Sequence, residues 1–138
     1  MVPINYGAVV VAALASMVLG YLWYGPLFGK VWMKLSGKTQ ESMSAKSNMG
    51  GMYLLAFIGS LVMAFVLAHA LVFASTYLHV MGTSAGLQAG FWNWLGFIAP
   101  VTLGMVLWDG KPWKLWILLN TYQLLSLLIM GLILANWK

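Results

Sequence analysis

The sequence predicts an all-α membrane protein: a bundle of four transmembrane helices with a short interfacial helix after the first span. The chain has 138 residues, of which 62% are hydrophobic and only 7% are charged. Charged groups are too few for a water-soluble globule, on whose surface roughly a quarter of the residues are charged. The apolar residues gather in four segments of about 20 residues, the length that spans a bilayer. We therefore expect residues 1–138 to form a single integral membrane domain.

The first predicted span covers residues 6–24, and small side chains recur along it at every fourth position. They are Ala8, Ala12, Ser16 and Gly20. Residues four apart share one face of a helix, and small residues on one face let a second helix approach closely in lipid. We expect this stripe to be a packing face, although alanine is also common in membrane helices for other reasons.

The first span ends in the sequence Trp23-Tyr-Gly-Pro, which precedes the first lysine of the chain, Lys30. This order is typical of a helix leaving the membrane, because aromatic rings lie among the headgroups and lysine stays in water. Pro26 lacks an amide hydrogen and disfavours helical geometry in Gly25, so the helix is expected to stop there.

Residues 26–51 are predicted to form an interfacial segment followed by a loop. Phe28, Val31, Trp32 and Leu35 have the spacing of one apolar helix face. This spacing favours a short helix in the headgroup plane, and an irregular loop that holds aromatic residues is the alternative. The polar remainder, residues 36–51, is expected to be a flexible loop.

The second predicted span, residues 52–73, repeats the stripe of small residues at four-residue spacing. Its members are Ala56, Ser60, Ala64 and Ala68. Two matching stripes on consecutive helices predict that the first and second helices pack through them. A connection over residues 73–85 is expected to follow.

The third predicted span, residues 87–108, contains Pro100 near its middle. Proline should kink this helix, a device that membrane helices tolerate when their neighbours satisfy the freed carbonyl group. A tight turn over residues 109–113 then leads to the fourth span, residues 114–135.

The ends of the first and third spans look alike. Trp23-Tyr-Gly25 ends one and Trp108-Asp-Gly110 ends the other, and a proline follows each within three residues. Such an internal repeat would relate two helix pairs by an axis along the membrane normal. Tryptophan and glycine are also favoured at such ends without any duplication.

Lysine counting orients the predicted spans. The first connection holds four lysines and the third holds two, whereas the opposite side has only Lys138. The positive-inside rule then places both connections in the cytoplasm and both termini outside the cell membrane. The excess of positive charge favours anionic lipid headgroups as partners, and the absence of arginine argues against nucleic acid.

Aromatic and basic residues at this cytoplasmic boundary form a candidate lipid-interface belt. Amphipathic Trp and Tyr rings anchor helix ends at the level of the headgroups, and lysines attract anionic lipids. The belt residues are Trp23, Tyr24, Lys30, Trp32, Trp113 and Trp116.

Polar side chains at membrane depth supply a second candidate site. Asn120 and Gln123 are three residues apart and share a helix face. Together with Asp109 they are candidates for a small polar pocket open to the cytoplasm. The alternative is that these amides make interhelical hydrogen bonds, as polar residues commonly do in membrane helices.

The sequence predicts no catalytic residue, metal ligand or cofactor, and hence no enzyme. It has no cysteine, and its two acidic residues, Glu41 and Asp109, are far apart in the chain. No full charge falls in the interior of a predicted span, whereas coupled transporters place such a group near mid-membrane.

Several segments together resemble a known family. They are Trp23-Tyr-Gly-Pro-Leu-Phe-Gly-Lys30, Trp94-Leu-Gly-Phe97, Lys114-Leu-Trp-Ile117 and Met130-Gly131. Over nearly its whole length the chain is similar to domain of unknown function family 1761, a family of small four-helix membrane proteins. The resemblance implies that fold but brings no activity, substrate or cofactor. A histidine of the family pattern stands where this chain has Gln123.

The leading functional hypothesis is a non-enzymatic membrane protein with a structural, accessory or lipid-interacting role, assembled as a homo-oligomer. The alternative is a small uncoupled channel or carrier for a neutral or anionic solute, also formed as a homo-oligomer. The sequence names no particular lipid or solute.

Overall fold

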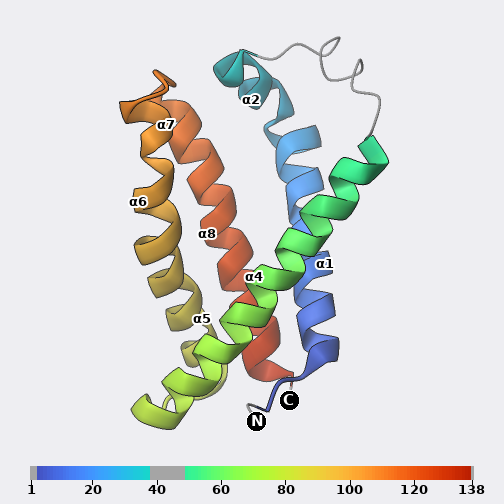
Figure 1. Ribbon diagram of the computed structural model, residues 1–138, viewed down its shortest axis with the longest axis vertical. Helices are drawn as coiled ribbons and strands as arrows, with labels where there is room; N and C mark the ends of the chain where they lie inside the picture. The colour runs from blue at the N-terminus through green and yellow to red at the C-terminus, as the bar shows by residue number, and fades with distance from the viewer. Residues whose placement is uncertain (1–2, 38–48, 138) are drawn as a thin grey trace.

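Helices arranged as one bundle make up the protein, and both termini lie at the same end (Figure 1). The structure is a computed structural model that describes residues 3–37 and 49–137. Within these two ranges the regular structure is entirely helical. The predicted all-α fold is therefore confirmed. Most of the loop predicted over residues 36–51 lies outside the described residues.

The described residues form nine helical elements. In order they are α1 (Tyr6–Leu22), the π-helical turn η1 (Trp23–Leu27), α2 (Gly29–Ser36), α4 (Met49–Leu78), α5 (Gly82–Asn93), the π-helical turn η2 (Trp94–Ile98), α6 (Ala99–Thr102), α7 (Gly104–Leu107) and α8 (Trp113–Asn136). Within residues 3–37 and 49–137, four stretches are long and apolar enough to cross a membrane: Tyr6–Leu27, Gly50–Leu78, Gly82–Leu107 and Trp113–Asn136. These stretches correspond to the four predicted spans.

The connection between the second and third spans is shorter than predicted. Because residues 73–78 contain neither glycine nor proline, α4 continues to Leu78, and α5 begins at Gly82. Positive φ angles at His79 (54°) and Gly82 (69°) turn the chain between them. With 30 residues, α4 is about 45 Å long, and it crosses the bundle obliquely (Figure 1).

Pro26 redirects the first span instead of ending it. The Phe28 amide donates to the Trp23 carbonyl, five residues back, at 2.9 Å. Gly25 takes a non-helical conformation (φ −111°, ψ −105°) within this π-helical turn. Because Pro26 supplies no amide hydrogen, the chain makes one wide turn before α2 begins. The predicted short helix after the first span is present as α2.

Pro100 divides the third span, as the sequence predicts. The π-helical turn η2 lies just before it, and the short helices α6 and α7 follow. A proline ring clashes with the carbonyl group four residues back in a regular α-helix, here that of Gly96. The wide turn of η2 moves this carbonyl aside.

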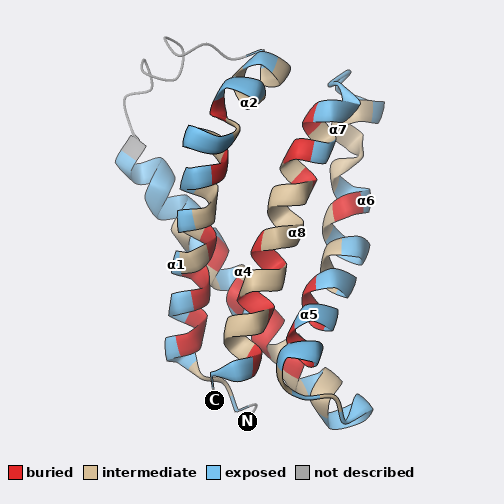
Figure 2. Cartoon of the chain, turned by 180° about the vertical axis from the view of Figure 1, so that it is seen from behind, coloured by how far each residue is buried: buried red, intermediate tan, exposed pale blue. Residues whose placement is uncertain are grey.

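Most of the small stripe residues of α1 and α4 lie in the bundle interior, although not all of these join the two helices to each other. Ala12 belongs to one buried cluster with Ala64 and Ala68, so the predicted contact is present. Ser16 instead bonds to Ser126 on α8, because the stripe on α1 faces two neighbours. Residues 50–59 of α4, including Ala56 of the stripe, are exposed apart from Phe57, as α4 leaves the bundle here (Figure 2).

The closest backbone contact in the bundle joins α5 to α8. Gly86 packs directly against Gly131, one turn of helix away from Gly90. A Cβ atom at Gly90 would lie 2.7 Å from the Leu127 carbonyl oxygen, closer than two such atoms can approach. Glycine at these positions is what lets the two helices touch, as in other membrane helix pairs.

Candidate functional site

Asn120, the centre of the predicted polar pocket, is buried, and both polar atoms of its side chain form a hydrogen bond. Its side chain is 1% exposed, and Nδ2 donates to the Trp116 carbonyl oxygen at 2.9 Å. Its Oδ1 accepts a bond from Thr102 Oγ1 at 2.8 Å, and Trp116 Nε1 donates to the same hydroxyl oxygen at 3.1 Å. These bonds hold α6 against α8, which is the interhelical role that the sequence left open.

The other two predicted pocket residues are less buried than Asn120. Asp109 is exposed in the turn between α7 and α8. Asn120 lies seven residues into α8, about 10 Å along its axis. Gln123 is half-buried further along the same helix. Asp109 is thus separated from Asn120, whereas Gln123 is three residues from Asn120 on the same helix, and the polar pocket stays a prediction.

Two residues of the predicted belt point inward. Trp23 is only 8% exposed, its Nε1 donates to the Leu118 carbonyl oxygen at 3.1 Å, and its ring lies 4.5 Å from that of Phe28. Trp116 bonds to Thr102, as described above. A buried tryptophan usually finds a partner for its N–H, so the same ring suits either a headgroup or a neighbouring helix.

The remaining belt residues lie near the end opposite the termini. Lys30 and Trp113 are exposed, and Trp32 and Tyr24 are half-buried. The Tyr24 ring is 5.4 Å from that of Trp32 and 5.2 Å from that of Tyr122 on α8. This smaller set is the part of the belt that the structure leaves near the surface.

Trp94 is the structural counterpart of Trp23, and the sequence analysis missed it. Each begins a π-helical turn and is followed after one residue by a glycine, Gly96 or Gly25. Trp94 Nε1 donates to the Asn120 carbonyl oxygen at 3.0 Å. Trp108, the predicted counterpart, is 84% exposed and does not occupy an equivalent position. The shared pattern Trp-x-Gly was the signal available in the sequence.

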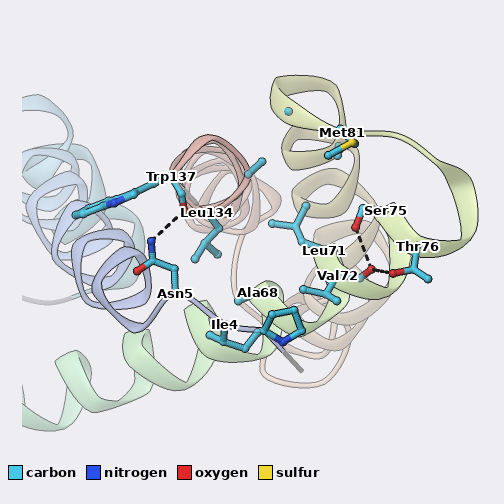
Figure 3. Close-up of a pocket in the computed structure, with 14 residues that line it drawn as sticks. Ile4, Asn5, Ala68, Leu71, Val72, Ser75, Thr76, Met81, Leu134 and Trp137 are labelled. Atoms are coloured by element: carbon cyan, nitrogen blue, oxygen red, sulfur yellow. Dashed lines mark hydrogen bonds between the residues drawn. The ribbon is translucent and has the colours of Figure 1, made fainter. Parts of the chain in front are cut away.

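A cavity of about 560 Å³ opens at the end of the bundle that holds the termini (Figure 3). Four separate segments build it: the residues before α1, the last turns of α4, the start of α5 and the end of α8. Its lining residues are Pro3, Ile4, Asn5, Ala68, Leu71, Val72, Ser75, Thr76, Met81, Gly82, Ala85, Leu134, Ala135 and Trp137. The sequence did not predict this cavity, because its four segments are distant from one another in the chain and none of them stands out by itself.

The cavity wall is mainly apolar, and its polar side chains are already bonded to backbone groups. Asn5 caps α1 by accepting from the Ala8 amide at 3.1 Å, and its Nδ2 donates to the Trp137 carbonyl oxygen at 3.2 Å. Ser75 and Thr76 both donate to the Val72 carbonyl oxygen, at 3.0 and 2.8 Å. None of the described residues that line the cavity has an ionisable side chain. Such a cavity is suited to binding an apolar molecule rather than to acid–base chemistry.

The described ranges contain no group of three or more His, Cys, Asp or Glu residues that could hold a metal ion. His69, half-buried on α4, has its Nδ1 atom 2.9 Å from the Phe65 carbonyl oxygen. Its ring lies 4.4 Å from that of Phe65. These contacts are made within its own helix.

The four apolar spans and the all-helical bundle define the class as a multi-pass membrane protein. The chain belongs to the family described as protein of unknown function DUF1761, whose members' shared pattern matches residues 7–135. The resemblance seen in the sequence is thereby confirmed. No curated protein and no solved structure matches the chain.

Proposed function

We propose that this is a non-enzymatic, lipid-interacting membrane protein that binds an apolar chain in the cavity at the terminal end of the bundle. The observation that carries the proposal is the cavity itself. Its volume of about 560 Å³ lies within the range of roughly 300–1,000 Å³ found for small-molecule sites.

The position of the cavity supports a ligand that comes from the membrane. Ala68 and Thr76 both line it, so it extends about 12 Å along α4. It lies at the end of three candidate spans, where the bilayer interior gives way to headgroups. Ala68 and Leu71 form its apolar depth, while Ser75 and Thr76 lie closer to the helix end (Figure 3).

The opposite end of the bundle suits a second kind of lipid contact. Lys30, Lys34, Lys111 and Lys114 are all exposed there, and clustered lysines next to spans attract anionic headgroups. This is the contact expected from the belt, now centred on Lys30 and Trp113. It is a surface contact, whereas the cavity lies between four segments of the bundle and is partly open.

The channel or carrier alternative and the homo-oligomer both stay predictions. Asn120 is only 1% exposed, and both polar atoms of its amide already bond to Thr102 and Trp116, which argues against a direct contact with a solute. Gln123 is then the remaining polar candidate on that face of α8. We favour the cavity because it supplies both volume and an apolar lining.

Native mass spectrometry of the protein extracted in mild detergent tests the proposal. We expect one small apolar molecule to remain bound. Val72→Trp should lower its occupancy about tenfold, because overpacking by a large ring typically costs about 1–3 kcal/mol. Val66→Trp is the matched control, since Val66 lies on α4 outside the cavity and is 56% exposed. Equal occupancy in the two variants, or no bound molecule in the unmodified protein, would contradict the proposal.

A further inference from the structure

We infer that the ligand of this cavity is an uncharged amphiphile, with one apolar chain and a neutral oxygen-containing head such as a hydroxyl group. The inference rests on the proposed function and narrows it to one chemical class. Three observations support it: where the charges lie, which hydrogen-bonding atoms line the cavity, and how those atoms are arranged.

The charged side chains of the described residues lie at the end of the bundle away from the cavity. Lys30 and Lys34 belong to α2, and Asp109 and Lys111 lie in the turn after α7. Figure 1 places α2 and α7 at one end and both termini at the other. An ionised head in the cavity would therefore lack an opposite charge among the described residues. Burying a charge without a partner is strongly unfavourable.

The lining atoms match a neutral head instead. The hydroxyl hydrogens of Ser75 and Thr76 are used on the Val72 carbonyl group, so their oxygens remain able to accept. Asn5 Nδ2 uses one hydrogen on the Trp137 carbonyl and carries a second one. A hydroxyl group, which both donates and accepts, can bond to either set.

These polar atoms lie along two edges of the cavity. Figure 3 shows Asn5 and Trp137 on one side and Ser75 and Thr76 on the other, with Ala68 and Leu71 between them. The apolar residues between the edges offer a surface for a hydrocarbon chain. A chain lying over this surface would bring a polar head to one edge.

Two probes that share one chain and differ in head charge test the inference. Oleyl alcohol and oleate are added at equal concentration to the purified protein at pH 9, where oleate is ionised, and occupancies are read by native mass spectrometry. We expect oleyl alcohol to be retained at least about tenfold more than oleate, because only the ionised head lacks a partner. Equal retention, or a preference for oleate, would overturn the inference while leaving the proposed cavity function in place.

A lysine added to the rim should reverse the preference. Thr76→Lys places a positive charge at a lining residue, and we expect it to raise oleate retention about tenfold over the unmodified protein. Thr83→Lys is the matched control, because Thr83 is exposed near the same end but does not line the cavity. Equal gains in both variants would mean that the charge acts from the surface, which contradicts a buried head.

Two further results have defined meanings. Lys138 follows the lining residue Trp137 in the sequence, and Lys138→Gln should leave the preference for oleyl alcohol unchanged. A preference that depends on Lys138 would overturn the inference. If neither probe is retained and Val72→Trp changes nothing, the proposed function itself fails.

Discussion

At the scale of single residues, Trp23 and Trp94 attach two different spans to α8 by the same bond. Each indole N–H donates to a main-chain carbonyl of α8, at Leu118 and Asn120. A carbonyl oxygen has two lone pairs, so it can accept this bond in addition to the one within its helix. The first and third spans lie on either side of α8 (Figure 1), so the two bonds hold the bundle from both sides.

Replacing either tryptophan by phenylalanine should weaken the bundle. Trp23→Phe and Trp94→Phe each remove a hydrogen bond and some ring volume, and we expect each to cost about 1–2 kcal/mol of stability. The measurement is the unfolding midpoint in mild detergent. Trp108→Phe is the control, and it should change the midpoint little because Trp108 is 84% exposed. A comparable loss in that control would refute the specific role of Trp23 and Trp94.

The two roles of tryptophan explain why the belt was only partly predictable. Composition and position showed that Trp23 and Trp116 lie near a helix end. Whether such a ring meets a headgroup or a neighbouring helix depends on which helix lies beside it. That neighbour is α8 or α6, and neither is adjacent in sequence. The same reasoning applies to Asn120, whose partner Thr102 lies on another element.

At the scale of elements, contact between glycines determines how closely α5 and α8 approach. Gly86 and Gly90 present one face of α5 to Gly131 and to the backbone at Leu127. Hydropathy alone located the four spans, because length and apolar content suffice for that. It did not identify α5 and α8 as a closely packed pair, because α1 and α4 also carry small residues on one face. Which of these faces meets a second backbone at close range becomes visible only in the structure.

Adding one methyl group at this contact should separate the helices. Gly90→Ala would bring Cβ within 3.1 Å of three backbone atoms of Leu127 and Leu128, and we expect a loss of about 1–3 kcal/mol. Gly59→Ala is the matched control, because no atom lies within 4 Å of its added Cβ. That variant should be neutral or more stable by about 0.5–1 kcal/mol, since alanine favours a helix. Thermal unfolding in detergent compares the two, and equal midpoints would rule out the close contact.

At the scale of the whole molecule, the two ends of the bundle differ in charge. One end holds the described lysines and Asp109, and the other holds the termini and the cavity. This asymmetry can be predicted from the sequence. Four spans bring both termini to one side, and the lysine-rich first and third connections lie on the other side. The positive-inside rule predicts that the lysine-rich end faces the cytoplasm.

Cysteine labelling in intact cells tests this orientation, because the chain has no cysteine of its own. Ser44→Cys, in the first connection and outside the described residues, should be protected from a membrane-impermeant reagent. Thr83→Cys, exposed at the start of α5, should react. Permeabilising the cells should expose Ser44→Cys and serves as the control. Labelling in the opposite pattern would place the termini in the cytoplasm.

The position of α8 as the shared partner also constrains how the protein is made. This helix follows the other three spans in the chain, yet its Ser126 shares a hydroxyl–hydroxyl bond with Ser16, and its main chain receives the indole bonds of Trp23 and Trp94. During synthesis these donors enter the membrane before their acceptors exist. Because the turn at residues 109–112 is short, we expect α8 to enter soon after the third span, which would limit the time that unpaired polar groups face lipid.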